Sequence, residues 1–388
     1  MSFLFEYIDI NPKETIIRGC LAKKIPMDKL QPFCRDIPEY ETSEFNGGSK
    51  FRNGDTIMAR ITPCLENGKT AMVNILDSNE VGFGSTEYIV FRAKKNLTTP
   101  DFVYYLICSS LVRDPAIKSM VGSSGRQRVQ TDVIANLDID FPKFSDQVKI
   151  AGVLKSLDDK IALNNEINNN LEQQAQAYFD DLFVINADPN WSECTLSDIG
   201  SVVAGGTPSK TKPEYYADQG IAWITPKDLS VNKSKFISHG ENDISELGYS
   251  KSSAAKMPAG TILFSSRAPI GYIAIAQNEV TTNQGFKSVI PNENIGTAYL
   301  YFLLKNLLPT IEGMASGSTF KEISGSAMKS VPTVMPDADT IQLFSSFCEP
   351  VFKEQEILEA ENQRLSALRN SLLPKLMSGE IDVSEVEI

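Results

Sequence analysis

Several loops of the chain carry side chains that could hydrogen-bond to DNA. Asparagine and glutamine can pair with adenine through two hydrogen bonds, arginine and lysine with guanine, and serine or threonine can contact base edges or phosphates. In the second half of the sequence these residue types gather near residues 207–210, 265–267, 281–287 and 316–321, and in the first half near residues 122–128. The candidate DNA-binding residues are Arg60, Ser123, Arg126, Gln127, Arg128, Thr207, Ser209, Lys210, Arg267, Asn283, Gln284, Lys287, Ser316, Ser318 and Lys321.

The clustering of these residues carries the prediction, because a single polar side chain in a loop is most often simply solvated. The residues do not form a catalytic site. The chain has one histidine, His239, so neither a Ser/His/Asp triad nor a paired-histidine metal site can be built within it. The six cysteines contain no CxxC pair and indicate reduced thiols of a cytoplasmic protein, not zinc ligands or disulfides.

Two further segments resemble catalytic motifs only weakly. Asn67–Thr70 reads like the end of a phosphate-binding loop, but Pro63 stands where that motif needs its first glycine. Asp138, Asp140 and Lys143 could suggest a nuclease, although a solvated strand end explains them better. No glycine-rich nucleotide fingerprint follows a strand. We therefore expect no catalytic residue, no metal site and no cofactor in this chain.

The charge of the chain is distributed unevenly. The net charge of −12 argues against nucleic-acid binding at first sight. However, residues 146–185 contribute −4 and residues 340–388 contribute −5, whereas residues 1–145 hold 18 acids and 18 bases. Nearly neutral globular parts would bind DNA weakly by themselves, since backbone affinity comes from neutralised phosphates. A DNA-reading function therefore predicts a basic partner that shares the contact with DNA.

The elements that must position these loops repeat with a period of 194 residues, half of the 388-residue chain. Pro142 matches Pro336 and Leu171 matches Leu365, each pair 194 residues apart. Residues 54–60 also match residues 260–266, at the slightly larger separation of 206 residues, as a turn glycine before a short apolar strand. Each half reads as a mixed α/β (α+β) module followed by one long helix, and we expect the two halves to be related by pseudo-two-fold symmetry. The predicted organisation is a first recognition module at residues 1–145, spacer helix 1 at 146–185, a second recognition module at 186–339, and spacer helix 2 with a C-terminal tail at 340–388.

The two long helices are expected to pair as an antiparallel coiled coil and to separate the two modules. Their apolar residues recur at spacings of three and four, which is typical of a coiled-coil seam. The simpler alternative is that each helix packs only on its own module and the two helices do not pair. A helix over residues 146–183 spans about 57 Å at 1.5 Å per residue, more than one turn of DNA. Pro350 and Pro374 should start, kink or end parts of the second helix. The predicted seam residues are Leu157, Ile161, Asn168, Leu171, Leu358, Asn362 and Leu365.

The second half carries five distinctive motifs, at Gly205–Ser209, Trp223–Leu229, Arg267–Gly271, Thr282–Lys287 and Ser316–Phe320. With these motifs it resembles a target-recognition domain of the DNA specificity (S) subunit of Type I restriction–modification systems. The first half is a looser match. It begins too late in its own repeat to hold the corresponding tryptophan and Gly-Gly-Thr-Pro segment, and Gly125–Arg128 stands where Thr319–Glu322 stands.

The resemblance implies a non-catalytic subunit that reads a bipartite, asymmetric double-stranded DNA target. It implies two methyltransferase subunits as partners, which bind S-adenosylmethionine and flip out an adenine, and nuclease/translocase subunits that use ATP and Mg²⁺. It also implies a cytoplasmic protein, and no apolar run reaches membrane-spanning length. Two alternatives stay open. One is a DNA-binding regulator or scaffold that is not coupled to methylation, and the other is an enzyme with an unrecognised active site.

Overall fold

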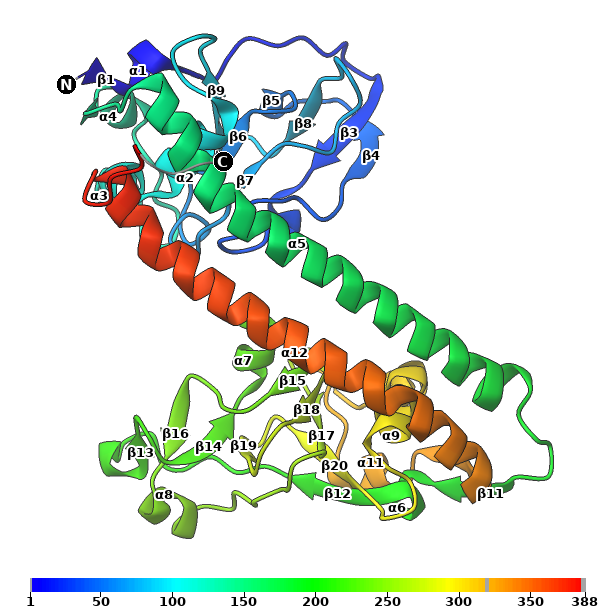
Figure 1. The fold of residues 1–388 in the computed structure, drawn as a ribbon. Coiled ribbons are helices and arrows are strands. Elements are labelled where there is room, and N and C mark those ends of the chain that lie inside the picture. The colour runs from blue at the N-terminus through cyan, green and yellow to red at the C-terminus, as the bar shows by residue number, and fades with distance from the viewer. Residues whose placement is uncertain (1, 318–320, 385–388) are drawn as a thin grey trace. The chain divides into compact units, whose positions relative to one another are not determined.

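The computed structural model describes residues 2–317 and 321–384, which divide into two compact units. Unit 1 comprises Met1–Leu163 and Asn362–Ile388, and unit 2 comprises Asn164–Glu361. Each unit contains one mixed α/β module together with part of each long helix (Figure 1). Within the described residues, no helix combines the length and the apolar character that a membrane span needs.

The module of unit 1 is built on two four-stranded sheets and a short strand pair. The central sheet has the spatial order β2 (Ile8–Ile10), β9 (Tyr88–Ala93), β6 (Thr56–Ala59), β7 (Thr70–Met72). The second sheet has the order β4 (Glu41–Glu44), β3 (Leu21–Ile25), β8 (Gly82–Gly84), β5 (Lys50–Phe51). Strand β1 (Ser2–Phe3) pairs with β10 (Asp138–Ile139). The short helices are α1 (Leu4–Tyr7), α2 (Pro100–Cys108), α3 (Ser110–Lys118) and α4 (Thr131–Ala135), with a 3₁₀ turn at Met27–Lys29.

The module of unit 2 repeats this plan with more strands. Its central sheet has the order β12 (Gly200–Ala204), β20 (Lys287–Pro291), β17 (Ile262–Ser266), β18 (Ile270–Ala276), β15 (Phe236–Ile237). The second sheet has the order β13 (Tyr216–Ala217), β16 (Asn242–Ile244), β14 (Ile221–Ile224), β19 (Thr281–Thr282), and β11 (Ser192–Thr195) pairs with β21 (Pro332–Met335). The short helices are α6 (Leu196–Ile199), α7 (Pro226–Val231), α8 (Glu246–Ser250), α9 (Thr297–Asn306), α10 (Leu308–Met314) and α11 (Gly325–Lys329), with a 3₁₀ turn at Pro213–Tyr215.

Equivalent helices cover the central sheet in the two modules. Helix α2 begins where Thr99 accepts a hydrogen bond from the Phe102 amide at 3.2 Å, with Pro100 in the first turn. It buries six consecutive side chains from Phe102 to Ile107, and α9 likewise buries residues 298–304. A helix that is buried nearly all round belongs to the interior of its domain. These helices therefore form the centre of each module's core, between the sheet and the long helices.

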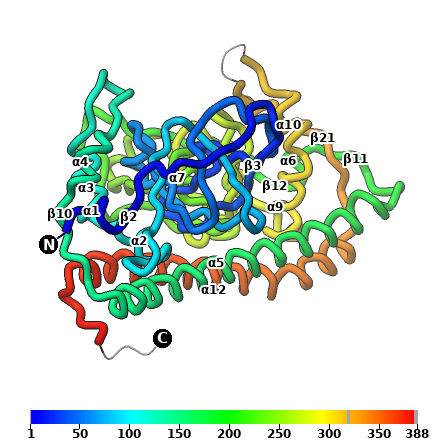
Figure 2. The backbone as a smooth tube through the Cα atoms, turned by 90° about the horizontal axis from the view of Figure 1, so that it is seen from above, coloured from blue at the N-terminus to red at the C-terminus, as the bar shows by residue number. Residues whose placement is uncertain are grey.

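The long helices are α5 (Phe144–Asp180), which continues as a π-helical turn at Asp181–Ile185, and α12 (Ala338–Met377). They run antiparallel within each unit (Figure 2). In unit 1, Asp158 of α5 meets Arg369 of α12. In unit 2, Asn164 donates to Glu361 at 2.8 Å, whereas the Tyr178 and Phe347 rings lie 4.8 Å apart. Residue numbers thus rise along one helix as they fall along the other, as the seam pattern predicts.

The predicted seam residues all lie at half-buried or buried positions of these helices. Leu358 is 5% exposed, and the Asn168 carbonyl accepts a hydrogen bond from Gln355 Nε2 at 3.1 Å. Helix α12 neither starts nor ends at Pro350 or Pro374, because it continues through both residues. A proline removes one backbone hydrogen bond from a helix interior. The remaining bonds and the packing of the helix in both units offset that loss.

The structure also corrects one expectation about the start of the first module. The segment β1–α1–β2 corresponds to β11–α6–β12, since β2 and β12 pair with the equivalent strands β9 and β20. In this register Ile10 stands where Val202 stands, so Lys13–Thr15 occupies the place of Gly205–Thr207. The first module thus contains this position, although the residues there are different.

Candidate nucleic-acid interface

The candidate loops of unit 2 meet at the end of strand β17. The Ser266 amide donates to the Gly285 carbonyl at 2.7 Å, and the Ile323 amide donates to the Ser266 carbonyl at 3.1 Å. Ser316 and Glu322 exchange two backbone hydrogen bonds, of 3.1 and 2.9 Å. The name hairpin 2 is used for the described residues at this pairing, Ser316, Gly317, Lys321 and Glu322. The structure therefore brings together three loops that are far apart in the sequence.

The fourth loop joins them through residues 205–207. The Gly206 amide donates to the Thr282 carbonyl at 2.9 Å, and the Thr207 hydroxyl donates to Gln284 Oε1. Neither of two neighbouring glycines leaves space for a side chain. A Cβ on Gly205 would lie 2.0 Å from the Asn283 carbonyl oxygen, and one on Gly206 would lie 2.3 Å from the backbone nitrogen of Ala254. Gly205 thus lets this loop lie directly against the loop that carries Gln284, and Gly206 lets it lie against the backbone of Ala254.

The polar side chains of these loops differ in their availability to a ligand. Asn283 Oδ1 accepts a hydrogen bond from the Gly285 amide at 2.8 Å, so this oxygen already stabilises the turn. Gln284 is exposed. Ser209 is also exposed, and its hydroxyl lies 2.9 Å from that of Thr211. The other exposed candidates in unit 2 are Lys210, Ser316 and Lys321, whereas Ser318 lies outside the described residues.

Two cations of unit 2 share one carboxylate. Arg267 Nη1 lies 3.4 Å from Glu322 Oε2, and Lys287 Nζ lies 3.7 Å from Glu322 Oε1. The Lys287 side chain is 11% exposed and also lies 3.5 Å from the Ser266 hydroxyl, whereas the Arg267 side chain is 39% exposed. Arg267 can therefore reach a ligand at the surface, and Lys287 is largely enclosed.

The candidates of unit 1 lie on a corresponding hairpin. Val121 and Arg128 exchange backbone hydrogen bonds of 3.0 and 2.9 Å and close hairpin 1 (residues 121–128). The Thr62 amide donates to the Gln127 carbonyl at 3.0 Å, which attaches hairpin 1 to the segment that follows β6. At the tip the Arg126 amide donates to the Ser123 carbonyl at 3.0 Å, and both residues are exposed.

Two cations of unit 1 again share one carboxylate. Arg128 donates from Nε and Nη2 to Glu87, with distances of 3.0 and 2.7 Å to the nearer oxygens, and Arg60 Nε lies 4.0 Å from the same carboxylate. The hydrogen bonds from Arg128 lower the pKa of Glu87 below its ordinary value. The three side chains are between 25% and 45% exposed.

The two hairpins occupy equivalent places but carry opposite charges there. The backbone of Arg128 forms antiparallel β-bridges with Val121 and Ile61. The backbone of Glu322 forms the same bridges with Ser316 and Arg267. In unit 1 the hairpin supplies the cation and the sheet side supplies Glu87, whereas in unit 2 the hairpin supplies the acid. Sequence reasoning missed both acids. Arg128 and Glu322 are 194 residues apart, so the reversal is visible in the repeat, but no local pattern points to Glu87.

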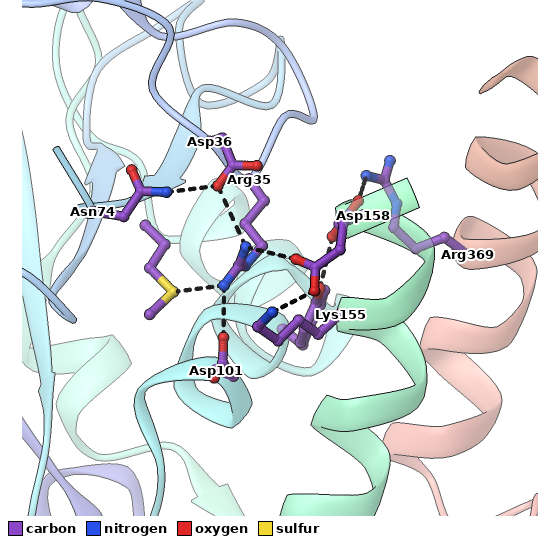
Figure 3. A network of polar contacts seen from close by, with 10 residues as sticks. Arg35, Asp36, Asn74, Asp101, Lys155, Asp158 and Arg369 are labelled. Carbon is purple, nitrogen blue, oxygen red and sulfur yellow. Dashed lines mark hydrogen bonds and ion pairs between the residues drawn. The ribbon is translucent and has the colours of Figure 1, made fainter. Parts of the chain in front are cut away.

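Sequence reasoning also missed a buried cation that attaches each module to the long helices. The Arg35 side chain, 9% exposed, lies 2.8 Å from Asp101 of α2 (Figure 3). It also lies 3.5 Å from Asp159 of α5. Nearby, Asp158 of α5 pairs with Arg369 of α12 and accepts a 2.7 Å hydrogen bond from the Tyr105 hydroxyl. These contacts hold α2, α5 and α12 together within unit 1.

The equivalent cation of unit 2 is Lys235. The Met72 amide donates to the Arg35 carbonyl at 2.9 Å in unit 1, and the Ile275 amide donates to the Lys235 carbonyl at 2.7 Å at the same place in unit 2. Lys235 forms an ion pair with Glu172 of α5 and donates to Gln355 of α12 at 2.7 Å.

The Lys235 Nζ also lies 4.0 Å from the centroid of the Phe352 ring. Burial lowers the pKa of Lys235, while Glu172 counteracts that shift. Within the described residues, no group of three or more His, Cys, Asp or Glu side chains is placed to hold a metal ion.

The chain thus has two duplicated α/β modules, each with a charged hairpin beside its central sheet and each attached to part of both long helices, which is the organisation that the sequence predicts for a recognition subunit. The chain belongs to the family of the Type I restriction modification DNA specificity domain, whose profile matches residues 32–173 and again residues 189–367. The chain is thus a DNA specificity subunit of a Type I restriction–modification system, with one recognition domain in each match.

The individual proteins that the chain is similar to are named as specificity subunits as well. The chain is similar to the Type I restriction enzyme MjaIX specificity subunit of Methanocaldococcus jannaschii, with 41% identity over 179 residues, which cover 44% of this chain and 41% of that protein. It is similar to the HindI specificity subunit of Haemophilus influenzae, with 26% identity over 85% of this chain and 87% of that one. A solved Type I S subunit from M. genitalium has the same fold, with a TM-score of 0.58 and 15% identity, over 97% of this chain and 95% of that one.

Proposed function

We propose that this chain is the non-catalytic DNA-reading subunit of its complex, with each module reading one half of a split target. The observation that carries the proposal is the pair of equivalent hairpins, each fixed by backbone hydrogen bonds beside the central sheet of its module. A hairpin held in this way can present donors and acceptors to base edges without adjusting its backbone. Specific contacts to DNA benefit from such preorganisation.

The two half-sites should differ in sequence. Hairpin 1 presents Ser123, Arg126 and Gln127, whereas exposed Ser316 and Lys321 belong to hairpin 2. The segment that contains Gly205 and Thr207 in unit 2 is replaced by Lys13–Thr15 in unit 1. Because unlike side chains pair with unlike base edges, the target is asymmetric.

The catalytic steps then belong to partner subunits. We assign methylation to two methyltransferase subunits that carry S-adenosylmethionine and flip out an adenine, and cleavage to nuclease/translocase subunits that use ATP and Mg²⁺. The net charge of −12 supports the requirement for partners, because such a chain neutralises few phosphates by itself. The long helices are the candidate docking elements, and the complex would work on DNA in the cytoplasm.

Two experiments test this function. The chain, expressed with the methyltransferase encoded beside it, should copurify with that enzyme, and the complex should methylate adenine in a split motif. Exchange of residues 1–145 for those of a relative with a different target should then change one half of the motif. A change in both halves would contradict the modular reading. Specific DNA binding by the chain alone, without a methyltransferase partner, would favour an uncoupled regulator.

A further inference from the structure

At each of the two hairpins, one carboxylate contacts two cations that are candidate DNA-binding residues. Glu87 contacts Arg128 and Arg60, and Glu322 contacts Arg267 and Lys287. Four of the fifteen candidate DNA-binding residues are therefore already in contact with a carboxylate of the same module. A DNA phosphate that approaches these cations must compete with that carboxylate.

The cation side chains are exposed enough for a phosphate to compete with the carboxylate. The Arg128, Arg60 and Arg267 side chains are 45%, 33% and 39% exposed, so they lie at the surface and can rotate toward a phosphate. Ion pairs in such positions contribute little to stability, because water screens them. Phosphate contacts, by contrast, are strengthened by the release of counterions from the DNA. A phosphate can therefore replace the carboxylate in these ion pairs. While the carboxylate remains bound, it competes with the phosphates of DNA that is not held by base contacts.

We propose that Glu87 and Glu322 are specificity-determining residues that act as internal counter-ions, each lowering the affinity of its module for DNA of unrelated sequence. The inference rests on the proposed DNA-reading function and deepens it. On a matched target, base contacts from the hairpin hold the module in place long enough for the cations to exchange the carboxylate for phosphate. On unmatched DNA the cations remain with Glu87 or Glu322, and the phosphate contacts are not made.

The number of surface cations that each carboxylate contacts makes the proposal quantitative. Removal of the charge at Glu87 releases two surface cations, Arg60 and Arg128. Removal of the charge at Glu322 releases one surface cation, Arg267, because Lys287 is only 11% exposed. Each phosphate contact steepens the dependence of log K on log salt concentration by about 0.9. The expected increases in slope are therefore up to about 1.8 for Glu87→Gln and about 0.9 for Glu322→Gln.

The experiment measures binding of a fluorescent duplex of unrelated sequence over a range of salt concentrations. The protein is the full chain in complex with its methyltransferase subunits. The matched controls are Glu39→Gln, which breaks an ion pair with Lys29, and Glu279→Gln, which breaks one with Lys256, since both remove the same charge from other partly exposed pairs. Methylation of matched and single-mismatch targets gives the discrimination.

The proposal expects steeper slopes for the two hairpin variants than for their controls, tighter binding of unrelated DNA at low salt, and reduced discrimination between targets. Glu87→Asp, which keeps the charge, should retain most of the wild-type slope, and Glu87→Ala should behave as Glu87→Gln. Slopes equal to those of the controls would overturn the proposal, as would loss of binding to all DNA. If instead the wild-type complex methylates no split motif, the proposed function itself fails.

Discussion

Replacement of Arg369 by methionine should destabilise unit 1 selectively. The Asp158 and Arg369 side chains are 5% and 11% exposed and pair with each other, so the substitution leaves Asp158 buried without its cation. Loss of one partner from a buried ion pair costs about 3–5 kcal/mol. The Tyr105 hydroxyl still donates to Asp158, which places the expected loss near the lower limit, about 3 kcal/mol. For a unit of this size the melting temperature should fall by about 6–12 °C.

The chain offers a convenient assay for this prediction. Both of its tryptophans, Trp191 and Trp223, belong to unit 2, so their fluorescence follows unit 2 whereas far-UV circular dichroism follows the whole chain. Arg369→Met should introduce an early transition in circular dichroism and leave the fluorescence transition close to that of wild type. The double variant Asp158→Leu, Arg369→Leu should recover most of the loss, because no unpaired charge then remains buried.

Two results would refute this reasoning. An Arg369→Met variant as stable as wild type would show that Asp158 is not effectively buried. A double variant no more stable than Arg369→Met would show that packing by the arginine side chain, and not its charge, holds α12 in unit 1.

Three further predictions concern other sites. Lys235→Met should lower the free energy of unfolding followed by tryptophan fluorescence by about 1.5–3 kcal/mol, because Glu172 loses its most buried cation and keeps Lys305; an unchanged transition would contradict this. The hydrogen bond from Arg52 holds the pKa of Glu14 below its ordinary value of 4.5. The stabilisation by Glu14 is therefore present above pH 4.5 and disappears as the pH falls through the lower pKa of the folded state. Glu14→Gln should thus make the circular-dichroism transition depend less on pH in the acid range. Gln284→Ala should cost about 1–3 kcal/mol at one base position, measured by methylation of single-mismatch targets; an equal loss on all sequences would mark a phosphate contact instead.

The sequence predicted the long helices well because their packing depends on local spacing. Phe344, Cys348 and Val351 recur at spacings of four and three, and the first two are fully buried in the core of unit 2. Such a pattern is determined by the periodicity of a helix and needs no knowledge of the partner. The duplication was visible for a similar reason, since both modules retain apolar strands at matched places.

The attachment of the modules to the helices could not be predicted in this way. Arg35 and Asp101 are 66 residues apart, and Lys235 and Gln355 are 120 apart. Isolated lysines and arginines are mostly exposed, so nothing in their local sequence indicates burial. The same holds for Glu87, which is 41 residues from Arg128. Polar contacts over such separations become visible only when the fold brings the residues together.

The most direct test of the central claim is a genome-wide map of methylated adenine. The map should be compared between cells that express this chain with its methyltransferase and cells that lack only this chain. The account predicts a split, asymmetric motif that is methylated only when the chain is present. A motif that remains methylated without the chain would contradict the account, because the methyltransferase would then select its own target.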